Sequence, residues 1–122
     1  MSVVTKSILS LALLLSGSYS LADCLPGSQG ADRILVHYRP GPNWSQIQTV
    51  MAGHLKFLKD QTAAQEIKFA GPVYAKNGDF EGGLVIFYSD SISHVESLLA
   101  NDPALQSQAA VYEVETWGEC AF

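Results

Sequence analysis

The stretch from His54 to Pro72 constrains the fold more than any other part of the sequence. It begins inside a helical pattern, crosses a polar break, and continues into the short β-prone run 66–70, which ends at Gly71 and Pro72. A helix that leads directly into a strand is a supersecondary unit with a fixed direction. The stretch also carries the best-placed ionisable side chain of the sequence, His54. We therefore expect the rest of the domain to pack around this unit.

The first 22 residues are typical of a secretory signal peptide. Lys6 provides a positive charge, residues 8–15 form an apolar run, and small residues suited to cleavage follow. The apolar run is much shorter than the ~20 residues that span a bilayer. Cys24 stands close enough to the cleavage site for lipidation, but Asp23 occupies a position where a small residue is needed. The sequence thus favours a periplasmic or secreted protein with no membrane attachment after cleavage.

Residues 23–122 are expected to form one domain, because about 100 residues suffice for a single modest core. The net charge of the chain is −5 at pH 7, without a basic cluster. This charge argues against nucleic acid or an anionic membrane as a partner. The three histidines and two cysteines lack a recognisable metal-ligand spacing. No cofactor motif is visible, so we expect neither a metal nor a cofactor.

Hydrophobic periodicity predicts six elements in the order β-α-β-β-α-β. They are a strand over 33–39, a helix over 44–61 capped by Asn43, a strand over 66–70, a strand over 84–88, a helix over 94–101 opened by Ser91 or Ser93, and a strand over 111–117. This order predicts a ferredoxin-like α+β sandwich with an antiparallel sheet. The Pro that follows Asp102 ends the second helix, because Pro cannot continue the hydrogen-bond ladder.

The two cysteines are expected to form a disulfide rather than remain as free thiols. In the predicted topology the first and last strands are antiparallel neighbours. Cys24 precedes the first strand and Cys120 follows the last, so the topology brings them together. Export makes the oxidised form possible.

Several short motifs occur in the same order as in a known family. They are His54-Leu55 with Leu58, Ala70-Gly71-Pro72, Gly82-Gly83-Leu84, Leu98-Leu99, Asp102-Pro103, and Val114 with Trp117, preceded by the run from Arg39 to Trp44. This ordered set resembles the YCII-related (YciI-like) family of small dimeric α+β barrel proteins. The signal peptide and the cysteine pair depart from the usual family pattern, which is cytoplasmic.

The resemblance implies a homodimer in which two sheets pack face to face. It also implies a His–Asp site, carried here by His54 and Asp102. A few relatives of this fold eliminate halide from small oxygenated ring compounds or isomerise them.

Each candidate site residue has a structural and a functional interpretation. His54 shares a helix face with apolar neighbours, so it is either a hydrogen-bonded packing residue or a general base oriented by Asp102. A histidine imidazole titrates near pH ~6.5, which suits acid–base work. Gly71 and Pro72 allow a sharp turn or shape a pocket wall, and Trp44 is a core residue or lines a pocket for a planar ligand.

Two functions are therefore compatible with the sequence. The first is an exported lyase or isomerase that acts on a small organic substrate through the His54–Asp102 pair. The alternative is a non-catalytic periplasmic module of the same fold that binds a small ligand or a protein partner.

Overall fold

The structure is a computed structural model that describes Cys24 and residues 29–122; the signal-peptide prediction for residues 1–22 lies outside the described residues. The elements in chain order are β1 (Gln29–Pro40), the 3-10 helix η1 (Trp44–Gln46), α1 (Ile47–Ala63), β2 (Ile67–Tyr74), β3 (Phe80–Phe87), α2 (Ile92–Leu99), α3 (Pro103–Gln106) and β4 (Ala110–Ala121). In the described part of the chain, no helix combines the length and apolar character needed to cross a membrane.

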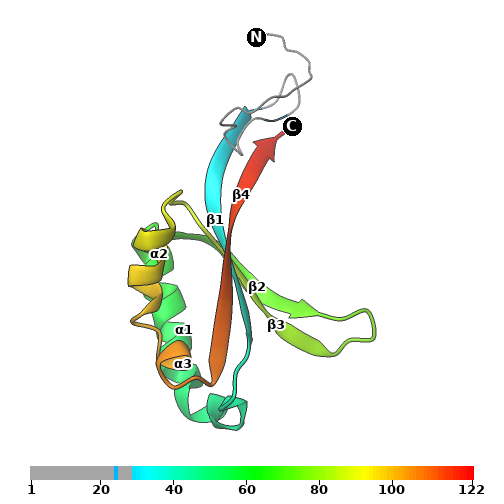
Figure 1. Cartoon of the computed structure of the whole chain (residues 1–122), viewed down its shortest axis with the longest axis vertical. Helices are drawn as coiled ribbons and strands as arrows, with labels where there is room; N and C mark the ends of the chain where they lie inside the picture. The colour runs from blue at the N-terminus through cyan, green and yellow to red at the C-terminus, as the bar shows by residue number, and fades with distance from the viewer. Residues whose placement is uncertain (1–23, 25–28) are drawn as a thin grey trace.

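The four strands form one antiparallel sheet in the order β2-β3-β1-β4. The order confirms the predicted ferredoxin-like α+β fold, with the first and last strands side by side. Figure 1 shows α1, α2 and α3 on one side of the sheet. The β2–β3 hairpin and the upper part of the β1–β4 ribbon extend beyond these helices (Figure 1).

The core lies between the sheet and the helices. Alternation along β1 directs Ile34, Val36 and Tyr38 toward the helices, and all three are buried. They meet side chains from α1, α2 and β3, namely Phe57, Val85, Phe87, Val95 and Leu99. The opposite face of the sheet has no helix over it in the described part of the chain (Figure 1).

The sequence suggested that the second strand ends at Gly71 and Pro72, but the structure shows that it does not. β2 continues through both residues to Tyr74. The sheet order explains this difference, because β2 is an edge strand. An edge strand tolerates the missing N–H of a proline, which a central strand does not. The following turn contains Gly78 at φ +94°, a backbone conformation that glycine adopts readily.

A disulfide joins Cys24 to Cys120, as predicted, with a Cα–Cα distance of 5.8 Å. The first strand begins at Gln29 rather than at residue 33, and Gly30 lies opposite Cys120 in the sheet. The sequence placed the start of this strand at residue 33 because residues 29–32 lack hydrophobic alternation. Pairing with the extended β4 provides its backbone hydrogen bonds instead.

The helix starts agree with the expected capping pattern at Ser91 but differ from it at Asn43 and Asp102. Asn43 does not cap η1 through its side chain; its amide donates to the carbonyl oxygen of Ser107 at 2.9 Å. Ser91 caps α2, since its hydroxyl accepts from the backbone N–H of His94. Asp102 does not lie at the end of α2, which stops at Leu99; it is the N-cap of α3. A carboxylate is favourable at a helix N-terminus, where it accepts from free backbone N–H groups and complements the helix dipole.

Candidate functional site

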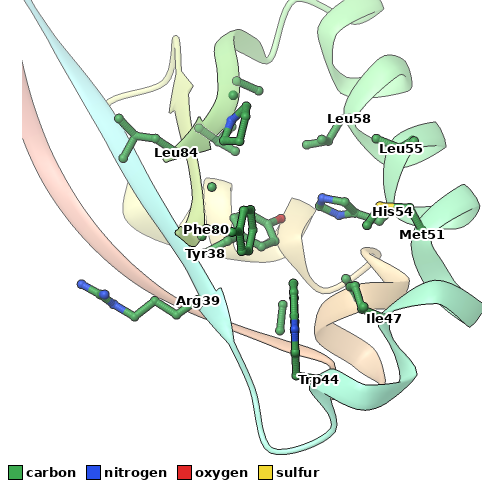
Figure 2. A pocket seen from close by; sticks show the side chains of 18 residues that line it. Tyr38, Arg39, Trp44, Ile47, Met51, His54, Leu55, Leu58, Phe80 and Leu84 are labelled. Carbon is green, nitrogen blue, oxygen red and sulfur yellow. The ribbon is translucent and has the colours of Figure 1, made fainter. Parts of the chain in front are cut away.

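A cavity of about 340 Å³ opens between α1 and the end of the sheet that carries the β2–β3 hairpin (Figure 2). The helical side of the cavity is formed by Ile47, Met51, His54, Leu55 and Leu58. The sheet side is formed mainly by small residues, which are Ala70, Gly71, Pro72, Gly82 and Gly83. Because these residues carry little or no side chain, the space between the helix and the sheet stays open at this end.

His54 lies on the cavity wall and reaches Asp102 behind it. The Nδ1 atom of His54 is 2.9 Å from Oδ2 and 3.1 Å from Oδ1 of Asp102. Gly53 permits this approach, because a Cβ there would lie 2.9 Å from the Pro103 ring. The glycine thus lets α1 pass close to the start of α3. The two residues that the sequence resemblance paired are brought together by the packing of these two helices.

The carboxylate of Asp102 is fully buried and accepts hydrogen bonds from three directions. Besides His54, the hydroxyl of Tyr38 donates to Oδ2 at 2.7 Å, and the backbone N–H of Ala104 donates to Oδ1 at 2.9 Å. A buried carboxylate needs such partners to offset the loss of hydration. Its position is therefore fixed by β1, by the first turn of α3 and by α1 together.

Tyr38 is a site residue that the sequence reasoning missed. Burial is the main cause that raises the pKa of its hydroxyl far above the ordinary value, and the neighbouring Asp102 raises it further. The hydroxyl therefore stays protonated and acts only as a donor to Asp102. Strand alternation puts Tyr38 on the same face as Ile34 and Val36, and a buried tyrosine hydroxyl usually has a partner. Nothing in the sequence shows which one, because the two residues are 64 positions apart.

This arrangement determines how a neutral His54 carries its proton. A carboxylate can only accept, so Nδ1 donates to Asp102 and Nε2 is left without a proton. Nε2 has no hydrogen-bond partner among the described residues. Chemically, the imidazole can accept a proton from a molecule in the cavity and return it.

The other residues predicted to contact a ligand also line the cavity. Trp44, on η1, stacks on Phe80 with a centroid distance of 5.6 Å and an interplanar angle of 17°. Gly71 and Pro72 form part of the β2 wall. Phe80 was not singled out from the sequence, because it stands just after a turn in a segment without clear alternation. The structure thus places Trp44, Gly71, Pro72 and His54 around one space.

The remaining histidines lie away from the cavity. His37 is on the sheet face without helices, where its Nε2 is buried and lacks a hydrogen-bond partner in the described chain. His94 pairs with Glu66 on the surface. Within residues 24 and 29–122, no group of three or more metal-ligating side chains is gathered.

The sequence model of the YCII-related domain family matches residues 33–118. Among solved structures, the chain is similar to 5-chloro-2-hydroxyhydroquinone dehydrochlorinase (TftG) from Burkholderia phenoliruptrix AC1100, solved in complex with 2,5-dihydroxybenzoquinone. The two sequences are 24% identical, the match covers 70% of this chain and 92% of that chain, and the TM-score is 0.58. It is also similar to the de novo designed protein Ferredog-Diesel, with 12% identity over 84% of this chain and 99% of that chain, and a TM-score of 0.42. No curated protein matches the sequence significantly. The likeness to TftG shows a shared fold.

Proposed function

This protein belongs to the YCII-related domain family, and we propose that it is an exported enzyme in which His54 and Asp102 act as an acid–base pair on a small organic molecule. The reaction is a lyase or isomerase reaction. One observation carries the proposal: His54 lines a cavity while its Nδ1 is held by a fully buried carboxylate. A histidine held only for packing does not need an open cavity beside its other nitrogen.

In this mechanism Nε2 of His54 removes a proton from the bound molecule. The imidazolium that forms is stabilised by the negative charge of Asp102, which also holds the ring in orientation. In an isomerase reaction the same proton returns to a different atom. In a lyase reaction a leaving group departs as the electron pair of the broken C–H or O–H bond forms a double bond. General acid–base catalysis of this kind contributes ~10²–10⁴-fold to a rate.

The nature of the substrate is suggested by the similar structure. TftG is described as a dehydrochlorinase and was solved with 2,5-dihydroxybenzoquinone. Dehydrochlorination is an elimination, which requires the removal of a proton. Small oxygenated ring compounds are therefore the first substrates to test with this chain.

Export is supported by the disulfide. Such bonds persist in oxidising compartments and are rare in the cytosol. The Cys24–Cys120 bond joins residues 96 positions apart, at the two ends of the fold. Together with the signal-like sequence of residues 1–22, it favours a periplasmic or secreted protein with residues 23–122 as its single mature domain.

A homodimer formed through the sheet face without helices is part of the proposal. On this face Leu35 lies between Ile86 and Glu115 of the neighbouring strands. The side chains of Phe69 and Trp117 on the same face are 62% and 38% exposed. A second copy would cover this apolar surface, as isologous dimers do. Light scattering coupled to size exclusion tests this: the Phe69→Lys variant should shift toward the monomer, and a monomeric native protein would contradict it.

Hydrogen exchange into bound compounds tests the catalytic proposal without knowledge of the product. The protein is incubated in D₂O with a panel of small hydroxylated rings, quinones and lactones, and deuterium uptake at carbon is measured by NMR. We expect exchange in at least one compound, because a base that removes a proton can return a deuteron. The exchange should disappear in His54→Gln and Asp102→Asn.

His94→Gln is the matched control, since it removes a histidine with a carboxylate partner far from the cavity. Exchange that survives in His54→Gln would refute the assigned base. Compounds that bind without any exchange would instead identify the non-catalytic ligand-binding module.

A further inference from the structure

The interior of the cavity offers very little to a charged ligand. Its walls are formed mainly by apolar side chains and by the backbone of glycine residues, and His54 is the ionisable residue of the lining whose ring nitrogen Nε2 has no partner within the described chain. Tyr38 also lines the cavity, but its hydroxyl is engaged with Asp102. Arg39 contributes to the wall, yet its guanidinium pairs with Glu113, and Figure 2 shows the side chain directed away from the cavity.

The charged group directly behind the His54 wall of the cavity is a carboxylate. Asp102 stands behind His54 at hydrogen-bond distance and has no exposed surface. An anion that enters the cavity would lose its hydration without gaining a cationic partner, and it would approach the charge of Asp102. A cation would also lose its hydration, and the imidazole and the tyrosine separate it from the carboxylate. An uncharged molecule avoids both costs.

We propose that the cavity selects uncharged ring compounds that carry one weakly acidic proton, and discriminates against their anionic and cationic analogues. The inference rests on the proposed function and specifies its substrate class by charge. In the reaction that follows binding of the neutral molecule, the O–H or C–H bond of the ligand breaks and its electron pair stays on the ligand. The proton forms a bond to Nε2 of His54. The ligand anion then lies beside an imidazolium, whose charge Asp102 balances.

The walls also favour a flat molecule of modest size. Trp44 and Phe80 present nearly parallel rings, and the opposing sheet surface is formed by residues with short side chains. Aromatic surfaces of this kind pack well against planar rings. A cavity of about 340 Å³ lies at the lower end of the range for small-molecule sites. One substituted ring therefore fits better than a fused or extended ligand.

Three analogues of nearly equal shape test the charge selection: benzamide is neutral, benzoate is an anion and benzamidine is a cation at neutral pH. Their affinities for the intact, disulfide-bonded protein are measured by NMR titration of the backbone amides around the cavity. We expect benzamide to bind at least about tenfold more tightly than either charged analogue. Equal or tighter binding of benzoate or benzamidine would overturn the proposal, as would failure of benzamide to bind.

Gly83 provides a variant that blocks the site without touching the acid–base pair. A Cβ there would meet its neighbours at ordinary distances of 3.7 and 3.8 Å, so Gly83→Ala should fold normally. Gly83→Leu should fill the cavity and abolish benzamide binding. If both variants fold and Gly83→Leu binds as well as Gly83→Ala, the ligand lies elsewhere and the proposal is wrong.

The failure of this proposal can be told apart from failure of the proposed function. Loss of carbon-bound exchange together with tight benzamide binding rejects the enzyme and keeps the charge selection. Exchange that depends on His54, with benzoate bound as tightly as benzamide, rejects the charge selection alone.

Discussion

Replacing Asp102 with alanine should lower the free energy of unfolding by about 3–5 kcal/mol. The variant leaves the buried hydroxyl of Tyr38 without an acceptor, which costs about 1–3 kcal/mol. It also removes the N-cap of α3, worth about 1 kcal/mol. The lost hydrogen bond to His54 adds a contribution of about 1 kcal/mol.

A double-mutant cycle with Tyr38→Phe isolates the largest of these contributions. Alone, Tyr38→Phe should cost about 1–2 kcal/mol, because it removes a buried hydrogen bond to a carboxylate. In the Asp102→Ala background the same change should cost nothing or stabilise the protein slightly, since the hydroxyl there has no partner. The difference between the two backgrounds is the coupling energy.

Urea denaturation followed by fluorescence and circular dichroism measures these values, with an unchanged m-value as the sign that the unfolded state is unaffected. Glu96→Ala is the matched control. It removes the acceptor of the Tyr112 hydroxyl, a hydrogen bond of the same 2.7 Å length on the surface. That change should cost less than about 1 kcal/mol, because water replaces the lost partner. An equal cost of Tyr38→Phe in both backgrounds would refute the reasoning.

Two further predictions concern the ribbon formed by β1 and β4. Hydrogen bonds from Lys68 and then Arg33 lower the pKa of the Glu119 carboxyl from its ordinary value of 4.5. A depressed pKa contributes stability that is present above the ordinary value and is lost as the pH falls through the folded-state value. Below pH 4.5 the unfolding free energy should therefore fall more steeply in the native protein than in Glu119→Gln; parallel curves from acid titration with urea melts would contradict this. The Cys24→Ser/Cys120→Ser variant should lose about 4–5 kcal/mol, because the bond closes a loop with a separation of 96 residues. Denaturation of the two forms under identical buffer measures the loss, and a difference below about 1 kcal/mol would mean that the unfolded chain is not constrained by the bond.

The fold was predictable because its elements follow from local patterns. Alternation in β1 and the three-to-four spacing along α1 identify both elements, and their order restricts the topology. Their ends were less predictable. Whether Pro72 ends a strand depends on whether that strand lies at the edge of the sheet, and no local pattern contains that information. Residues 29–32, which lengthen β1 beyond its predicted start at residue 33, likewise are part of the strand because they pair with β4.

The site was predictable only in part, for a similar reason. Strand and helix periodicity indicate which way Tyr38 and His54 point, but not which residue each one meets. Asp102 was selected by its position in a family motif, and its catalytic role stays a prediction. The hydrogen bond from Tyr38 depends on the packing of β1 against the start of α3. The cavity itself arises from small residues such as Gly83 opposite α1, and a missing side chain leaves no periodic signal.

The bond between Cys24 and Cys120 also decides how the protein carries mechanical load. Tension applied through the chain on either side of the pair passes across the covalent bond and bypasses the sheet. The 96-residue separation corresponds to a contour length of roughly 330 Å that stays locked while the bond is intact. In a force-extension measurement the reduced protein should release that length as β1 and β4 part, whereas the oxidised protein should not. The cavity is thereby shielded from any pull on the two ends of the domain.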